Sequence, residues 1–224
     1  LENLEALAQA ESMDNGKPLS LSRAVDIPRS AYNFEFFADA VTQFAGESYQ
    51  TSEQTLNYVL HQPLGVVGCI SPWNLPLYLF TWKIVPALAM GNCVVAKPSE
   101  VTPLTTYLLS HPCKEAGLPP GVLNIVHGLG GDVGAALSRH PAIKAISFTG
   151  STLTGRKISE EAGPRFKKMA LEMGGKNATV VFADCDFEKT VNEVARSAFS
   201  NQGQICLCGS RILIEKSIDE KFKN

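Results

Sequence analysis

The sequence has no long hydrophobic run, no block of like charge and no cysteine pair at metal-binding spacing, and each absence removes a class of protein. No uninterrupted apolar stretch approaches the roughly 20 residues that a membrane-spanning helix needs. Lys and Arg number 20 against 22 Asp and Glu, for a formal charge of −2, and no basic segment is present. The sequence therefore predicts neither a membrane partner nor a nucleic-acid partner.

The spacing of the cysteines indicates neither a metal site nor a disulfide framework. The six cysteines are scattered along 224 residues, without a CxxC pair and without paired histidines. A structural zinc site needs four ligands, so no metal is expected. Scattered cysteines in a chain of this size fit reduced thiols, which predicts a cytoplasmic protein.

Short apolar strands alternate with helices through the middle of the chain. Strands are expected over 93–96, 122–126, 143–148 and 168–173, with helices near 77–90 and 103–116. This alternation predicts an α/β fold with a Rossmann-like parallel sheet that has helices on both faces. Ahead of it, two strands over 55–61 and 64–70 are expected to form a hairpin.

The stretch from Leu171 to Arg211 places a carboxylate and a thiol at the two ends of a strand–helix unit. Glu172 precedes a double glycine, and Cys206 lies in a small, polar, glycine-punctuated loop. Chain reversal can bring the two side chains together, which suggests a thiol nucleophile with a general base. The plainer interpretation is that Cys206 and Cys208 are two buried loop thiols, the commoner fate of cysteine.

Asn74 lies in Pro72-Trp73-Asn74-Leu75-Pro76, where a proline restricts the chain on either side of one amide. A fixed side-chain N–H of this kind can stabilise a developing oxyanion. Asn in a proline-rich turn is more often structural, so the motif by itself leaves both interpretations open.

Two loops after expected strands suggest a pyrophosphate site. Gly128-Leu129-Gly130 begins like a dinucleotide motif, but the third glycine is Gly134, one position late. Phe148-Thr149-Gly150-Ser151 opens a helix whose free N–H groups and Ser151 hydroxyl can meet a pyrophosphate. A simple N-cap explains Ser151 equally well.

The loop Lys97-Pro98-Ser99-Glu100 also follows an expected strand, at the end where open α/β sheets bind ligands. An acidic residue there can accept hydrogen bonds from ribose hydroxyls and would repel a 2′-phosphate, which favours NAD over NADP. The alternative is that Lys97 and Glu100 are solvated loop charges.

Together these motifs resemble the signature set of the NAD(P)-dependent aldehyde dehydrogenase superfamily, in its order and at about its spacing. They are Pro72–Pro76, Lys97–Glu100, Phe148–Ser151, Leu171–Asn177 and Asn201–Arg211. The resemblance implies that Cys206 is the nucleophile, Glu172 the general base and Asn74 the oxyanion-stabilising amide. It implies an NAD site that includes Trp73, Lys97, Ser99, Glu100, Gly130, Gly150, Ser151 and Gly174.

Within the superfamily, segments such as Asp26–Arg29 and Gly203–Cys208 resemble 2-aminomuconic and 2-hydroxymuconic semialdehyde dehydrogenases. The resemblance implies that Arg29 faces a substrate carboxylate. A guanidinium can bind a carboxylate through two parallel hydrogen bonds. A surface arginine at a helix start is the alternative. The expected reaction oxidises a carboxylate-bearing semialdehyde, such as 2-aminomuconic semialdehyde, to the acid with NAD through a cysteine thiohemiacetal and thioester.

Members of the superfamily are considerably longer, so the resemblance implies a fragment. We expect an NAD-binding domain over 1–54 and 71–174, incomplete at its start, an oligomerisation-arm hairpin over 55–70, and the beginning of a catalytic domain over 175–224. The complete protein is expected to be a homo-oligomer, a dimer or tetramer, that acts on a small aldehyde, and the isolated chain to turn over poorly. The alternative is an inactive truncated form with a binding role or a structural, crystallin-like role.

Overall fold

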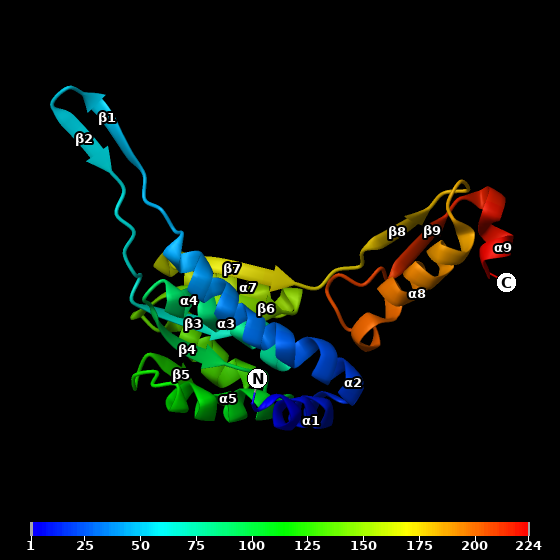
Figure 1. The fold of residues 1–224 in the computed structure, drawn as a ribbon, viewed down its shortest axis with the longest axis horizontal. Helices are drawn as coiled ribbons and strands as arrows, with labels where there is room; N and C mark the ends of the chain where they lie inside the picture. The colour runs from blue at the N-terminus through cyan, green and yellow to red at the C-terminus, as the bar shows by residue number, and fades with distance from the viewer. Residues whose placement is uncertain (1, 224) are drawn as a thin grey trace.

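A computed structural model describes residues 2–223, and its centre is a five-stranded parallel sheet (Figure 1). Its strands are β3 (Val66–Ile70), β4 (Cys93–Lys97), β5 (Leu123–Ile125), β6 (Ile143–Gly150) and β7 (Lys168–Met173). The order β5-β4-β3-β6-β7 runs outward from β3 in both directions, and every neighbouring pair is parallel. The expected Rossmann-like α/β sheet is confirmed. Such sheets bind ligands beside the carboxyl ends of the strands where the order reverses, here between β3 and β6.

Helices cover both faces of the sheet, because side chains along a strand point alternately to one face and the other. The helices are α4 (Pro76–Ala89) and α5 (Leu104–Glu115) on one face, with η2 (Gly130–Gly134), α6 (Ala135–Arg139), α7 (Thr152–Ala162) and η3 (Gly163–Arg165) toward the other. Val67 and Cys69 of β3 pack with Phe80 of α4, whereas Ile70 packs with Ile158 of α7. The sheet therefore separates two buried apolar clusters.

The first segment of the chain packs on α4 and α5 rather than on the sheet. Its elements are α1 (Leu4–Asn15), α2 (Leu19–Leu21), the π-helical turn η1 (Ser22–Asp26) and α3 (Ile27–Thr42). Gly16 ends α1 with a left-handed φ of 79°, which glycine adopts without steric cost. Pro28 lies in the first turn of α3, a position at which a helix tolerates the missing N–H of proline.

The hairpin expected over 55–70 is wrong. β2 (Thr55–Tyr58) pairs antiparallel with β1 (Ser48–Ser52), and Val66–Ile70 is the middle strand of the central sheet. A continuous apolar run such as Val66–Ile70 is typical of a strand buried on both faces. Ser48–Ser52 is exposed at every position, so no hydrophobic period marks it as a strand. The β1–β2 hairpin projects away from the rest of the chain (Figure 1).

A separate strand–helix–strand unit follows the central sheet (Figure 1). It consists of β8 (Ala178–Val181), α8 (Phe187–Gly203) and β9 (Arg211–Ile214), followed by η4 (Lys216–Ile218) and α9 (Asp219–Lys223). β8 and β9 are parallel and form their own two-stranded sheet. Asp186 caps α8 by accepting a hydrogen bond from the Lys189 N–H at 3.3 Å. Within residues 2–223, no helix has the length and apolar character to cross a membrane.

Candidate active site

The Pro72–Pro76 loop and the loop that carries Cys206 meet in the folded chain. Asn74 lies between the end of β3 and the start of α4, and its side-chain Nδ2 donates to the Gln204 carbonyl oxygen at 2.6 Å. In return, Asn201 Nδ2 donates to the Asn74 carbonyl oxygen at 2.9 Å. Two residues predicted to share a site are thus held in neighbouring loops although more than 120 residues separate them in sequence.

The two cysteines of the second loop differ in access. Cys206 is exposed, whereas Cys208 is buried and its thiol lies 3.7 Å from the Ser200 carbonyl oxygen. Asn177 Nδ2 donates to the carbonyl oxygens of Cys206 at 2.7 Å and Cys208 at 3.4 Å, which fixes the backbone of the loop. Of these two thiols, Cys206 is therefore the one that a substrate can reach. The sequence motif contained Asn177, but its supporting role depends on the β8–β9 pairing, which spacing alone does not give.

Glu172 lies on β7 opposite Thr149 of β6 and is exposed. Among the described residues 2–223, its carboxylate takes part in no side-chain hydrogen bond or ion pair, and its one electrostatic effect is to raise the pKa of Lys83. The connection to the thiol loop comes instead from Asn177, five residues further along the chain. The close approach of Glu172 to Cys206 therefore stays a prediction. Gly174 lies in the same connection, where a Cβ atom would meet no heavy atom within 4 Å.

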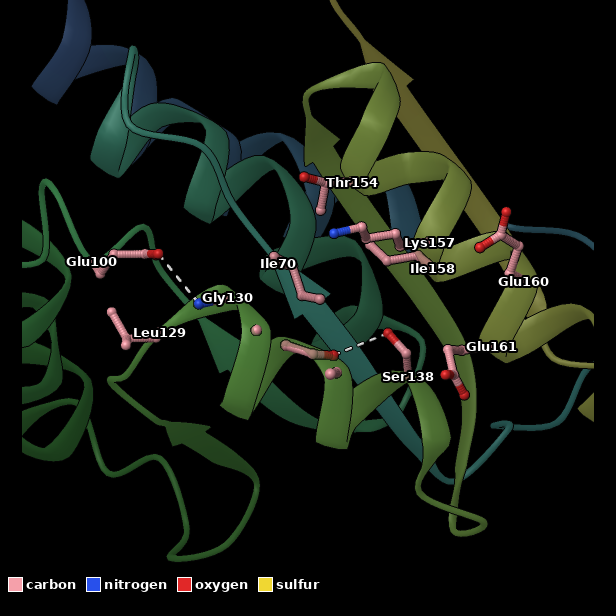
Figure 2. A pocket seen from close by; sticks show the side chains of 13 residues that line it. Ile70, Glu100, Leu129, Gly130, Ser138, Thr154, Lys157, Ile158, Glu160 and Glu161 are labelled. Atoms are coloured by element: carbon pink, nitrogen blue, oxygen red, sulfur yellow. Dashed lines mark hydrogen bonds between the residues drawn. The ribbon is translucent and has the colours of Figure 1, made fainter.

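A cleft of about 530 Å³ opens beside the end of β3, between the Glu100 loop and α7 (Figure 2). Glu100 lies on its wall, where Lys97 Nζ donates to Oε2 at 2.7 Å and the Gly130 N–H donates to Oε1 at 3.2 Å. Lys97 is buried, and its hydrogen bond holds the pKa of the Glu100 carboxyl below its ordinary value. Glu100 is thus an ionised acceptor in a cleft at the carboxyl end of the sheet.

This donor and acceptor set fits the adenosine part of NAD. The Glu100 carboxylate is 41% exposed, which leaves it open to ribose hydroxyls while Lys97 holds it in place. Glycines 130, 131 and 134 line the cleft and leave room on that side. Lys97 and Glu100 are not simply solvated loop charges, which was the alternative. Lys97 is buried and forms an ion pair with the partly exposed Glu100.

The other residues predicted for the cofactor have local structural roles in this fold. Ser151 caps α7, because its Oγ accepts the Thr154 N–H at 3.1 Å. A Cβ atom on Gly150 would lie 2.5 Å from the Phe148 ring, so any larger residue there would require the buried Phe148 side chain to shift. Ser99 is buried and its Oγ accepts the Val101 N–H at 3.2 Å. Trp73 is exposed beside Asn74.

Arg29 lies over the first turn of α4, which begins directly after the Asn74 loop. Its Nη2 donates to Tyr78 Oη at 3.2 Å, and its guanidinium stands 5.4 Å from the centre of the Tyr78 ring and 5.9 Å from that of Tyr32. The hydrogen bond with Tyr78 raises the pKa of Arg29 above its ordinary value. The side chain is exposed and keeps free donors, as the capture of an anion requires.

Lys83 and Lys17 are buried, which the sequence motifs do not predict. Lys83 of α4 is buried with Nζ 3.4 Å from Ser147 Oγ, and burial lowers its pKa to about 8 despite the opposing effects of Cys69 and Glu172. Lys17 follows α1, and its Nζ donates to Asp26 Oδ2 at 2.7 Å and lies 3.8 Å from Glu11 Oε1. The sequence does contain a signal for each of them. Lys83 is the only charged residue in the apolar segment that forms α4, and Lys17 comes directly after the glycine that ends α1.

The cluster of Glu11, Lys17 and Asp26 has one carboxylate more than it has cations. Burial raises the pKa of Glu11 to about 7 from its ordinary value of 4.5, against the opposing effect of Lys17. Between these values the folded protein holds a proton that the unfolded chain has released. The contribution of Glu11 to the free energy of unfolding is therefore complete below pH 4.5 and declines as the pH rises to about 7.

Glu11→Gln is expected to remove most of this decline, which is at most on the order of 3 kcal/mol. Urea unfolding at pH 5 and pH 8 should show a wild-type protein that loses stability with rising pH and a variant that loses much less. Asp26→Asn is the matched control, because it leaves the Lys17 ammonium poorly paired and should cost about 3 kcal/mol or more at both pH values. Parallel pH dependence in wild type and Glu11→Gln would contradict the assignment.

Comparison with known proteins gives one consistent result along the whole chain. Residues 1–224 match the pattern of the Aldehyde dehydrogenase family. The chain is 54% identical over 220 residues to a 2-aminomuconic semialdehyde dehydrogenase of Danio rerio, covering 98% of the chain and 45% of that protein. Among solved structures, a variant aldehyde dehydrogenase from Bacillus cereus superposes with a TM-score of 0.97 at 39% identity, covering 99% of this chain and 45% of that one. Betaine aldehyde dehydrogenase from Staphylococcus aureus, solved with NAD+, superposes with a TM-score of 0.95 at 41% identity. That match covers 99% of this chain and 44% of the other. The chain thus spans about half the length of the relatives it matches.

Proposed function

Because the chain belongs to the aldehyde dehydrogenase family, we propose that the complete protein oxidises an aldehyde to a carboxylic acid with NAD. The observation that best supports this is the contact of the Asn74 side-chain amide with the loop of Cys206, 2.6 Å from the Gln204 carbonyl oxygen. An exposed thiol and a fixed amide donor in neighbouring loops are the two groups that acyl-type chemistry at a carbonyl carbon needs first.

In the proposed mechanism the Cys206 thiolate attacks the aldehyde carbon and forms a thiohemiacetal. The negative charge then develops on the former carbonyl oxygen. Asn74 Nδ2 carries two N–H groups, of which one binds the Gln204 carbonyl oxygen and the other remains to donate. Together with the Cys206 backbone N–H, this second group would stabilise the oxyanion.

When bound, NAD would supply the acceptor for the hydride that leaves the substrate carbon. Glu100 would accept hydrogen bonds from the ribose hydroxyls of its adenosine, with Lys97 and Gly130 holding the carboxylate in place. The start of α7 at Ser151 would face the pyrophosphate. Cys206 then carries the acyl group as a thioester, and Glu172 takes a proton from the water that hydrolyses it.

We further propose a semialdehyde with a remote carboxylate as the substrate. The similarity to a 2-aminomuconic semialdehyde dehydrogenase supports this class, as does the exposed guanidinium of Arg29 beside the first turn of α4. A guanidinium binds a carboxylate through two parallel hydrogen bonds, and a neutral aldehyde offers it no such partner.

Arg29→Ala in the complete protein is expected to lower kcat/KM for an acidic semialdehyde by about 10- to 100-fold, the value of a lost charge-assisted hydrogen bond. The value for a neutral aldehyde should stay within about threefold, because the variant removes no catalytic group. Arg23→Ala is the matched control, since this exposed arginine pairs with Glu5 at 2.8 Å rather than with Tyr78. Equal losses for both aldehydes would remove the specificity role.

The remaining proposals concern assembly and compartment. The β1–β2 hairpin carries exposed Tyr49, Leu56 and Tyr58 and extends away from the sheet, which suits an arm that pairs in a homo-oligomer. The arm therefore includes residues 48–58 rather than 55–70. All six cysteines are free, which agrees with a reducing, cytoplasmic environment.

A further inference from the structure

The backbone of the Asn74 loop is held by the end of α1. Asn15 Nδ2 donates to the Trp73 carbonyl oxygen at 2.7 Å, and Lys17 Nζ lies 3.4 Å from the Asn74 carbonyl oxygen. Gly16 stands between the two donors with its left-handed φ of 79°, which reverses the chain so that both side chains reach the loop. Two successive carbonyl groups of the loop are thus bound from one short segment.

Lys17 is itself fixed by buried carboxylates. Its side chain is 0% exposed, and the side chains of Glu11 and Asp26 are 0% and 2% exposed. The ammonium lies 2.7 Å from Asp26, while the second oxygen of Glu11 accepts the Leu77 N–H in the first turn of α4 at 3.4 Å. An ammonium this far from water is stable only where partners surround it, so its position is well determined. The cluster joins α1, η1 and α4 beneath the loop.

The Asn74 carbonyl oxygen receives a second donor from the nucleophile side. Asn201 Nδ2 binds it at 2.9 Å, and Asn201 belongs to the turn that ends α8 just before Gln204 and Cys206. Asn74 is therefore held at its carbonyl by Lys17 and Asn201 and at its side chain by Gln204. Because the carbonyl and the Cβ share one Cα, fixing the carbonyl plane also fixes the direction in which the amide points.

We propose that Lys17 is a positioning residue that orients the Asn74 amide toward the carbonyl oxygen under attack at Cys206. The inference rests on the proposed function, in which that amide meets the oxyanion. An oxyanion donor acts only when it is aimed in advance, and a displacement of about 1 Å can cost a factor of 10² in rate. A lysine that merely stabilised the fold would affect the amount of folded protein and leave the turnover of the folded fraction unchanged.

The test compares three variants of the complete protein with wild type. Lys17→Met leaves Asp26 as a buried unpaired carboxylate, so the double variant Lys17→Met/Asp26→Asn removes both of these charges. Glu11 remains, and loss of the opposing effect of Lys17 raises the pKa of Glu11 further, which favours its neutral form. Arg23→Met is the control, because Arg23 lies in η1, as Asp26 does, but binds Glu5 at the surface. For each protein, kcat and KM for the aldehyde are measured together with the unfolding midpoint and the hydrogen exchange of the backbone amides of residues 73–75 and 77.

The double variant is expected to unfold near the wild-type midpoint and to show faster exchange at the amides of residues 73–75 and 77. Its kcat should fall about 10- to 100-fold while KM for the aldehyde changes by less than about threefold, which marks a loss confined to the transition state. Arg23→Met should keep the wild-type kcat. A folded double variant with wild-type kcat, or a loss that appears only in KM, would overturn the positioning role. Failure of the wild-type protein to oxidise any aldehyde would instead reject the proposed function, and the exchange data would still report whether Lys17 holds the loop.

Discussion

Cys206→Ala in the complete protein is expected to abolish aldehyde oxidation, with a loss of at least about 10⁴-fold in kcat. The proposed chemistry runs entirely through the covalent bond between this sulfur and the substrate carbon, and no neighbouring group replaces it. Cys208 is two residues away, but it is buried and held near the Ser200 carbonyl oxygen. Assays of NADH formation at high enzyme concentration measure the residual rate.

Cys208→Ala is the matched control for this substitution. It removes the same type of side chain from the same loop, yet the Asn177 contacts to the loop carbonyls remain because they involve only backbone acceptors. Its kcat should be close to wild type, with at most a modest loss of stability from the small cavity. Inactivation by Cys208→Ala together with an active Cys206→Ala would exchange the roles of the two thiols.

Glu172→Gln is expected to separate the two halves of the reaction. Attack by Cys206 and hydride loss do not need the carboxylate, so one equivalent of NADH per active site should form rapidly. Hydrolysis of the thioester loses its general base and should slow by about 10²- to 10⁴-fold. Rapid-mixing measurement of NADH absorbance should therefore show a burst followed by a slow steady state.

Two other outcomes would contradict this role for Glu172. A steady-state rate equal to wild type would mean that another group activates the water. Loss of the burst itself would mean that Glu172 acts before or during the attack by Cys206. Glu115→Gln is a suitable control, because Glu115 is an exposed carboxylate at the end of α5 and does not line the cofactor cleft.

Much of the central sheet could be predicted because burial gives its inner strands a readable pattern. The strand expected over 93–96 is β4 (Cys93–Lys97), which is buried or half-buried at every position, and the expected helix near 77–90 is α4 (Pro76–Ala89). Helices of this kind must bury an apolar face, and strands covered on both sides read as continuous apolar runs. The local sequence therefore contains enough information to place these helices and strands.

The prediction of the hairpin was wrong because one of its actual strands, Ser48–Ser52, shows neither the alternating nor the continuous apolar pattern of a buried strand. Ser48–Ser52 is polar and exposed, and its pairing with Thr55–Tyr58 depends on backbone hydrogen bonds across a turn. The apolar run Val66–Ile70 follows Thr55–Tyr58 closely in sequence and therefore resembles its hairpin partner, although it pairs with β4 and β6. Parallel partners are separated by whole helices, so sequence proximity misleads at such a position.

For the candidate site, sequence motifs predict the reacting groups but not the residues that support them. Cys206, Asn74 and Glu100 belong to motifs whose residue types have a direct chemical reason. Asn201 and Lys17 act by binding the carbonyl of Asn74, at separations of 127 and 57 residues. Nothing in a single sequence couples such positions, because the contact exists only once the loop, α1 and the end of α8 have packed together.

The most direct test of the central claim is to locate the covalent intermediate. The complete Glu172→Gln protein is mixed with NAD and an acidic semialdehyde, quenched in acid within the burst, digested, and sequenced by tandem mass spectrometry. The account predicts the substrate acyl mass on Cys206, and its absence from the same peptide in Cys206→Ala/Glu172→Gln. An acyl group on Cys208 or on any other residue, or NADH formed without a covalent adduct, would contradict Cys206 as the nucleophile.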